Sequence, residues 1–264
     1  MITKIKEIVD YLDEVFRPEL QEDYDNSGFL VGRGEAECTG VLVALDLTDG
    51  VLAEAMDMGA NLIVTHHPLI FGGVKRITDR NDSGRLLMKL ICNGVAVYAA
   101  HTNLDNLPWG VNGALGERLG LANCHILKQL DCSEEEAGAG MIGELATGEP
   151  LCDFLQRVKA VLGLSTLRYA GGQGVKTVKR VAFCGGSGAF LIGDAVAARA
   201  DIYLTADLKY HDFQRATATM ALADIGHYES EQFAKDIIFS VISRKFSNFA
   251  CRISEKQGSL VSYI

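Results

Sequence analysis

Short apolar runs rich in β-branched residues recur along the chain and predict the buried strands of a parallel sheet. These runs are residues 41–47, 61–65, 95–100, 178–184 and 202–205. Stretches with helical spacing separate most of them, at residues 50–58, 84–92, 188–199 and 229–246. Strands that alternate with helices are typical of strand–helix–strand units, in which the strands run parallel. The pattern therefore predicts an α/β protein.

An internal repeat refines this prediction. Residues 60–67 align with residues 200–207, and residues 97–101 align with residues 223–227 in the same order. A strand, a turn and a helix precede residues 60–67 and also precede residues 200–207. Each of the two repeats then ends in a His-x-x-x-carboxylate sequence, His101 to Asp105 in the first and His227 to Glu231 in the second. Matches in the same order along the chain predict two related α/β lobes with mostly parallel sheets flanked by helices.

The segment between the two repeats has a pattern of its own. It predicts a helix near residues 111–119, an acidic loop at 131–136, a strand near 141–145, a helix at 151–162 and a strand near 165–169. We therefore expect a first lobe at residues 1–106, an inserted α+β segment at 107–177, and a second lobe at 178–264 that completes a metal cleft.

Charge and composition narrow the class of protein. The 264 residues include 25 Lys and Arg against 34 Asp and Glu, a net charge of −9 that disfavours nucleic acid as the partner. No stretch approaches the roughly 18 apolar residues of a membrane span, and residues 1–18 predict an amphipathic helix rather than a signal peptide. The seven cysteines contain no C-x-x-C pair and suggest reduced thiols in a cytoplasmic protein.

Four of the six histidines, at positions 66, 67, 101 and 227, follow predicted strands. Ligand sites of parallel α/β sheets lie beyond the carboxyl ends of the strands, so we expect these rings in one place. The adjacent pair His66 and His67 can share a site only if the chain has turned, as the following Pro68 suggests. A lone histidine at a strand end is usually only a satisfied polar residue. Histidines clustered with carboxylates instead suit zinc, iron or manganese.

Four blocks of residues also resemble the signatures of a known family. They are Asp25-Asn26-Ser27-Gly28 with Gly32, Thr65-His66-His67-Pro68 with Phe71, His101-Thr102-Asn103-Leu104-Asp105, and Gly226-His227-Tyr228-x-Ser230-Glu231, in which x stands for any residue. In this order they resemble the Nif-three-like family, often labelled GTP cyclohydrolase 1 type 2 homologues. The resemblance implies a two-lobed α/β fold, a dinuclear metal centre and a homohexamer built from dimers.

The resemblance also implies a set of ligands. His67 and Asp105 would hold one divalent ion, His66 and His227 would hold the other, and Glu231 would bridge the two. His101 would lie close by as a catalytic residue that carries a proton.

The expected function is a metal-dependent hydrolase acting on a small, anionic, nucleotide-like substrate. Two ions would activate water and polarise that substrate. The family label implies GTP, opened at the imidazole ring of guanine with release of formate, although no motif here selects a purine. The alternative is a metal-bound scaffold or regulator without turnover.

Other polar segments leave alternatives open. The sequence Gly185-Gly186-Ser187-Gly188 is a tight turn or a phosphate cradle, and it matches neither G-x-G-x-x-G nor a P-loop. Ser187 is a poor nucleophile candidate because Ala189 replaces the glycine of G-x-S-x-G. Residues 207–212 line a substrate mouth or begin a solvated helix, and residues 25–28 form a turn or a loop facing the metals.

Overall fold

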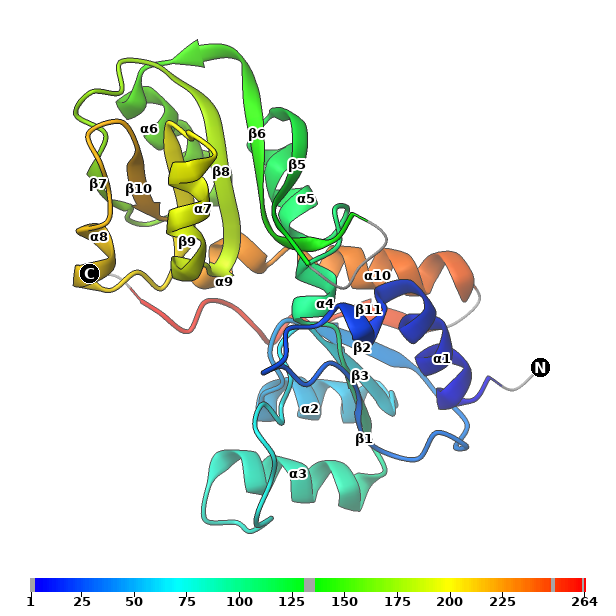
Figure 1. Cartoon of the computed structure of the whole chain (residues 1–264). Coiled ribbons are helices and arrows are strands. Elements are labelled where there is room, and N and C mark those ends of the chain that lie inside the picture. The colour runs from blue at the N-terminus through cyan, green and yellow to red at the C-terminus, as the bar shows by residue number, and fades with distance from the viewer. Residues whose placement is uncertain (1–2, 131–135, 248–249, 263) are drawn as a thin grey trace. The chain divides into compact units, whose positions relative to one another are not determined.

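The computed structural model describes residues 3–130, 136–247, 250–262 and 264 (Figure 1). The chain forms two compact units. The first contains Met1–Leu104 and Ala234–Gly258, and the second contains Asp105–Phe233 and Ser259–Ile264. Each unit has one sheet with helices packed against it, which confirms the predicted α/β class.

The sheet of the first unit has five strands in the order β1-β4-β3-β2-β11. Only β1 runs antiparallel to its neighbour, while β2, β3, β4 and β11 are parallel. The strands are β1 (Gly28–Val31), β2 (Val41–Ala44), β3 (Leu62–Thr65), β4 (Ala96–Ala99) and β11 (Cys251–Ile253). Parallel β2, β3 and β4 therefore end at the same edge, where the first unit's histidines follow.

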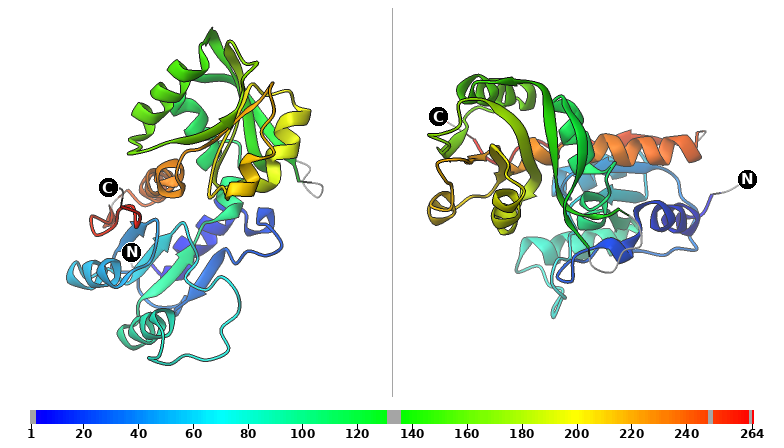
Figure 2. Two further views of the ribbon diagram at one scale, coloured as in Figure 1. Left: turned by 90° about the vertical axis from the view of Figure 1, so that its left-hand side faces the viewer. Right: turned by 45° about the horizontal axis from the view of Figure 1, so that its top comes forward.

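Helices cover both faces of this sheet, as Figures 1 and 2 show. Leu52 of α2 and Leu90 of α3 pack with Ile63 of β3 in one core. On the other face, Tyr98 of β4 donates a hydrogen bond to Asp13 of α1 at 2.9 Å. The helices are α1 (Ile5–Phe16), the short 3₁₀ helix η1 (Pro18–Leu20), α2 (Asp49–Asp57), α3 (Asp82–Asn93) and α10 (Ala234–Lys245).

The second unit has six strands in the order β5-β6-β8-β9-β10-β7. The central strands β8, β9 and β10 are parallel, and β6 and β7 flank them in antiparallel orientation. The strands are β5 (Leu121–Gln129), β6 (Gly138–Glu149), β7 (Arg168–Gly171), β8 (Val178–Ser187), β9 (Ile202–Ala206) and β10 (Ala221–Asp224). Strands from the expected insertion thus share one sheet with strands of the expected second lobe.

Alternation along β8 divides the core of this unit between two faces. Phe183 packs with Phe154 of α6, whereas its neighbour Ala182 packs with Ile192 of α7 on the opposite face. The helices are α5 (Val111–Arg118), α6 (Leu151–Leu162), the 3₁₀ helix η2 (Ala189–Leu191), α7 (Ile192–Ala197), α8 (Tyr210–Phe213) and α9 (His227–Glu231). The four-residue helix α4 (Thr102–Asp105) crosses the boundary between the units in sequence.

The two parallel cores reproduce the predicted repeat, β2-β3-β4 in one unit and β8-β9-β10 in the other. Their registers correct one detail of the alignment. The N–H of Ala100 donates to the carbonyl of Thr65, and the N–H of Ile225 donates to the carbonyl of Thr205. Ile225 therefore corresponds to Ala100, so His227 lies one position beyond the equivalent of His101.

The unit boundaries differ from the ranges 1–106, 107–177 and 178–264 expected from the sequence. Pairing of β6 with β8 joins the middle segment to the second unit, and pairing of β11 with β2 returns residues 234–258 to the first. Most of the expected acidic loop, residues 131–135, lies outside the described residues. Among the helices that are described, none combines the length and apolar character needed to cross a bilayer.

Candidate metal centre

His66 and His67 leave the end of β3 on a sharp turn. The N–H groups of both residues reach carbonyls of the chain that continues β2, His66 to Ala44 at 3.2 Å and His67 to Leu45 at 2.9 Å. Consecutive residues of a regular strand point to opposite sides, so the chain has turned at this point. The Thr65 hydroxyl closes the turn by donating to the His67 carbonyl at 2.7 Å. The two imidazole centroids lie 4.9 Å apart, and the pair faces one site as predicted.

His101 joins this pair from the end of β4. One ring nitrogen from each of His66, His67 and His101 lies within 4.8 Å of the others, close enough for a shared metal site. His66 is fully buried, and the other two rings are half-buried. The first unit therefore brings together all three histidines that the sequence placed at its strand ends.

Each of these rings is held through its Nδ1 atom. Nδ1 of His66 lies 2.7 Å from the Ala100 carbonyl, and Nδ1 of His67 lies 2.7 Å from Asp46 Oδ1. A carbonyl oxygen can only accept, so His66 carries its proton on Nδ1 and presents the lone pair of Nε2. Metal-binding histidines commonly have this arrangement, with the second nitrogen donating to a carbonyl or carboxylate.

Asp25 holds His101 in the same way, at 2.7 Å between Oδ1 and Nδ1. Its buried carboxylate also accepts hydrogen bonds from the N–H and the hydroxyl of Thr102. Burial alone would raise the pKa of Asp25, but the bonds from His101 and Thr102 outweigh it and keep this pKa well below its usual range. Of the two interpretations of residues 25–28, the structure favours the loop that faces the histidines.

In the second unit, His227 and Glu231 lie one turn apart on α9. Nε2 of His227 is 2.9 Å from Oε2 of Glu231, and its Nδ1 is 2.7 Å from Asp207 Oδ2. Burial lowers the pKa of His227, yet hydrogen bonds to Glu231 and Asp207 raise it to about 9. Because His227 and Glu231 are four residues apart on α9, both candidate metal ligands lie on one face of the helix.

The glycine segment, residues 185–188, supports Glu231 rather than a phosphate. Its first three residues are the end of β8, at a register shift against β9, rather than the expected tight turn. The N–H groups of Gly185, Gly186 and Gly188 already donate to the side chains of Asn112, Ser230 and Thr205, which argues against a phosphate cradle. A Cβ on Gly186, whose φ is +58°, would overlap the Glu231 carboxylate, so this glycine leaves room for a candidate ligand.

Asp105, the last residue of α4, comes four residues after His101 and is half-buried. Its carbonyl accepts a hydrogen bond from the Asn112 amide at 3.1 Å.

Residues 207–212 contain the start of the exposed helix α8, as one of the two interpretations expected. Asp207 does not cap this helix, since its carboxylate lies 2.7 Å from Nδ1 of His227. The N–H of Lys209 at the start of α8 is instead capped by Asp212, at 2.8 Å.

The orienting acid Asp46 was not among the residues predicted from the sequence. It lies two residues beyond Ala44, the end of β2, and β2 neighbours β3 in the sheet. The available signal was a carboxylate that follows β2, because β2 lies next to β3, the strand that leads into the histidines. One aspartate in a loop is too common to stand out without the strand order.

Comparison with known proteins finds relatives that match nearly the whole chain. The family model Duf34/NIF3 (NGG1p interacting factor 3) matches residues 3–258. The chain belongs to the Duf34/NIF3 family. This membership confirms the resemblance found in the four sequence blocks.

Individual relatives span nearly the whole chain. A protein of Clostridium perfringens named GTP cyclohydrolase 1 type 2 homolog is 37% identical over 231 residues, which cover 86% of this chain and 87% of the relative. The crystal structure of Staphylococcus aureus hypothetical protein SA1388 matches with a TM-score of 0.89 at 30% identity, covering all of both chains. A Bacillus cereus protein related to NIF3 matches with a TM-score of 0.91, and its 24% identity supports the fold alone.

Proposed function

We propose that this Duf34/NIF3 protein is a dinuclear metal-dependent hydrolase of a small, anionic, nucleotide-like substrate. The carrying observation is the shared orientation of four imidazoles. In His66, His67, His101 and His227, Nδ1 lies 2.7 Å from an oxygen that fixes the orientation of the ring. Imidazole nitrogens fixed in this way, with carboxylates nearby, fit zinc, iron or manganese.

The ligand assignment is part of the same proposal. In this assignment His67 and Asp105 would hold one ion, His66 and His227 would hold the other, and Glu231 would be a ligand of both. Membership of the Duf34/NIF3 family supports this assignment across the whole set of blocks.

Two divalent ions would supply Lewis-acid chemistry and lower the pKa of a water molecule between them. His101 is proposed as the residue that carries the proton, at its Nε2 atom. Asp25 fixes the other nitrogen of that ring and so sets the direction in which the proton moves. An ion bound at Nε2 of His227 would take the place of the 2.9 Å contact between this atom and Glu231, two proposed ligands that already lie within reach of one another.

The substrate class rests on the names of the relatives. Several curated relatives are called GTP cyclohydrolase 1 type 2 homolog. For this chain we propose GTP as the first substrate to test, with opening of the guanine imidazole ring and release of formate. An acidic chain with a net charge of −9 accommodates an anion best where cations offset that charge.

Metal analysis followed by turnover tests this function. The wild type is expected to retain about two ions per chain and to release formate from GTP or phosphate from a phosphoester panel. His66→Ala and Glu231→Ala, one from each unit, should both lose metal and activity. His125→Ala, an exposed histidine of β5, is the matched control and should change neither.

The outcomes separate the alternatives. A shared centre predicts that either variant disturbs both ions, whereas separate sites predict that each variant loses only its own. Fewer than one ion per wild-type chain, or full activity in both variants, contradicts the hydrolase. Two tightly held ions without turnover of any substrate would favour a scaffold instead.

We further propose that the protein is cytoplasmic and assembles as a homohexamer, as its family resemblance implies. Light scattering coupled to size-exclusion chromatography measures the assembly directly. A mass of one chain of 28.5 kDa at micromolar concentration would contradict the oligomer.

A further inference from the structure

Two half-exposed aromatic side chains lie beside His101 in the first unit. The ring centroids of Tyr24 and Phe71 are 6.1 Å apart, and Phe71 lies 6.0 Å from the His101 ring with the planes at 71°. Tyr24 is 59% exposed and Phe71 is 51% exposed. Large aromatic rings grouped at a surface usually mark a binding site, because their burial is favourable and is not used within the fold.

The loop that orients His101 also holds this aromatic pair. The Asn26 side chain donates to the Ile70 carbonyl at 2.6 Å, immediately before Phe71. The N–H of Ser27 donates to the Gln21 side chain at 2.7 Å, so the loop is itself tied back. The rings are therefore positioned before any ligand binds, which lowers the entropy cost of binding.

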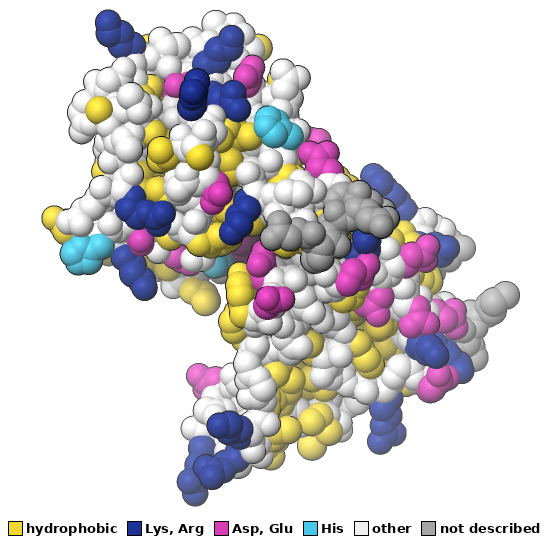
Figure 3. Space-filling view, in the orientation of Figure 1, with side chains coloured by type: hydrophobic (Ala, Val, Ile, Leu, Met, Phe, Trp, Pro, Cys, Tyr) yellow, Lys and Arg dark blue, Asp and Glu magenta, His cyan; other side chains and the backbone are white. Residues whose placement is uncertain are grey.

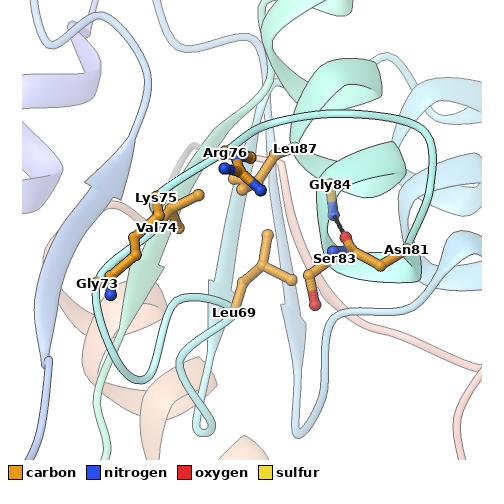
Figure 4. Close-up of a pocket in the computed structure, with 9 residues that line it drawn as sticks. All are labelled: Leu69, Gly73, Val74, Lys75, Arg76, Asn81, Ser83, Gly84 and Leu87. Atoms are coloured by element: carbon orange, nitrogen blue, oxygen red, sulfur yellow. Dashed lines mark hydrogen bonds between the residues drawn. The ribbon is translucent and has the colours of Figure 1, made fainter.

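Beyond Phe71, the same segment lines a cavity of about 630 Å³ with the start of α3 (Figure 4). This volume falls within the range of small-molecule sites, roughly 300–1,000 Å³. Leu69 and Leu87 form part of its wall, and Lys75 and Arg76 contribute the cationic side chains. The cavity thus pairs apolar walls with positive charge.

The positive charge of this cavity is not neutralised by the fold. Within the described ranges, no ion pair involves Lys75 or Arg76. The nearby Asp82 is instead paired with Arg85 on α3. Figure 3 shows Lys and Arg side chains gathered at the lower left, over the region of α3 and the loop before it. In a chain with a net charge of −9, such a local excess favours an anion.

We propose that residues 69–76 form the substrate-recognition segment of the site, with Tyr24 and Phe71 stacking on a planar ring while Lys75 and Arg76 bind an anionic group of the same molecule. This inference rests on the proposed function and names the residues that select its substrate. Phe71 and Lys75 are four residues apart, a reach of at most about 14 Å. A nucleotide-sized molecule spans that reach, with its base on the aromatic pair and its phosphates at the cations.

Calorimetric titration of the metal-loaded protein with three probes tests this division of roles. The probes are GTP, guanosine, which lacks phosphate, and inorganic tripolyphosphate, which lacks a ring. Phe71→Leu should weaken guanosine and GTP about tenfold and leave tripolyphosphate unchanged, because it removes stacking alone. The double variant Lys75→Gln with Arg76→Gln should weaken GTP and tripolyphosphate about tenfold and spare guanosine.

Matched controls come from the second unit. Tyr169→Leu removes an aromatic ring that is 49% exposed, and Lys176→Gln removes an exposed cation. Both should leave binding of all three probes unchanged. All the altered side chains are exposed, and thermal melting verifies that each variant folds.

The expected result is a crossed pattern, in which the Phe71 variant loses only the probes with a ring and the Lys75 and Arg76 variant loses only the probes with phosphate. Changes below twofold, equal weakening of all three probes, or no binding of any probe by the wild type at millimolar concentration would overturn the inference. The last result would leave the aromatic pair as a surface for a protein segment. Metal content and turnover of the same samples separate this inference from the hydrolase. A crossed pattern without turnover contradicts only the hydrolase, whereas turnover without the pattern contradicts only the recognition segment.

Discussion

The two units use equivalent strands for different tasks. In the first, β3 leads into His66 and His67, and the acid that holds His67 comes from Asp46 after the neighbouring strand β2. In the second, β9 leads into Asp207, which holds a histidine supplied after β10. Positions that correspond in the repeat therefore supply a candidate ligand in one unit and an orienting acid in the other.

What the two units share is a contact rather than a residue at a fixed position. His67–Asp46 and His227–Asp207 both join Nδ1 to a carboxylate oxygen at 2.7 Å. The one-residue shift between His101 and His227 has a structural consequence. His227 begins α9 and reaches Glu231 one turn later, whereas His101 precedes α4. Among the described residues, only those of the second unit place a histidine and a carboxylate of the candidate site on one helix beside a glycine segment, residues 185–188.

The largest expected effect comes from adding a side chain at Gly186 in this glycine segment. In Gly186→Ala the new methyl group overlaps the Glu231 carboxylate, and the residue keeps an unfavourable positive φ. We expect binding of at least one ion to be lost and stability to fall by about 1–3 kcal/mol. Metal titration and urea unfolding measure the two effects.

Gly163→Ala is the matched control for this change. Gly163 also has a positive φ, +70°, but open space surrounds the position of its Cβ. It should show the backbone strain without the loss of metal. If the two variants lost stability equally and both kept their metal, Gly186 would matter for the backbone conformation alone and not for the space that Glu231 occupies.

The next test compares the orienting acids directly. Asp46→Ala and Asp207→Ala each leave a histidine without the carboxylate that fixes its ring, and each should weaken metal binding about 10–100-fold. Asp49→Ala and Asp153→Ala are surface controls in the same units and should change metal affinity little. A large loss from one orienting acid and none from the other would show that the shared contact has unequal importance.

The sequence predicts the central strands well because burial fixes their composition. Residues 41–47, 61–65 and 202–205 differ from β2, β3 and β9 by a few residues at their ends, and the helix expected at 151–162 coincides with α6. A strand buried on both faces has to be apolar throughout. Its sequence therefore carries the signal whatever its neighbours are.

Three of the four edge strands and the orienting acid Asp46 carry no such local signal, whereas the fourth edge strand, β7, overlaps the strand expected near residues 165–169. β1, β5 and β11 escaped prediction because edge pairing depends on the partner strand, such as Phe29 opposite Tyr98, more than on local composition. The helix expected at 229–246 is divided into α9 and α10 at the point where the chain returns to the first unit. The positions of the histidines were visible in the sequence, whereas Asp46 became meaningful only through the strand order.

Two buried tyrosines extend the comparison to the cores. The Tyr203 hydroxyl of β9 donates to the carbonyl of Gly188 at 2.8 Å, and the Tyr98 hydroxyl of β4 donates to Asp13. Tyr203→Phe leaves a buried carbonyl short of a donor and should cost about 1–2 kcal/mol. Tyr98→Phe should cost less, because the half-buried Asp13 carboxylate regains water. Urea unfolding of both variants measures the difference, and a larger loss for Tyr98→Phe would reverse this order.

The smallest expected effect concerns Asp13 itself. Burial raises the pKa of this carboxyl, and the hydrogen bond from Tyr98 offsets only part of that rise. Because the folded state favours the protonated form, this contribution to stability is present below the unfolded pKa of about 4 and is lost as the pH rises through the folded value. Asp13 also lies in the last turn of α1, where a negative charge opposes the helix dipole.

Asp13→Asn should therefore match or exceed the wild type by a few tenths of a kcal/mol at pH 7, after allowing for solvent screening. The amide oxygen can still accept from Tyr98, so the packing of α1 on β4 should persist. Urea unfolding at pH 4, 5.5 and 7 checks the sign, with Asp10→Asn on the exposed side of α1 as the control. A variant that is less stable than the wild type at pH 7 and gains relative stability as the pH falls would mean that the ionised carboxylate stabilises the first unit. The Tyr98 contact would then behave as a charged hydrogen bond, unlike its neutral counterpart at Tyr203.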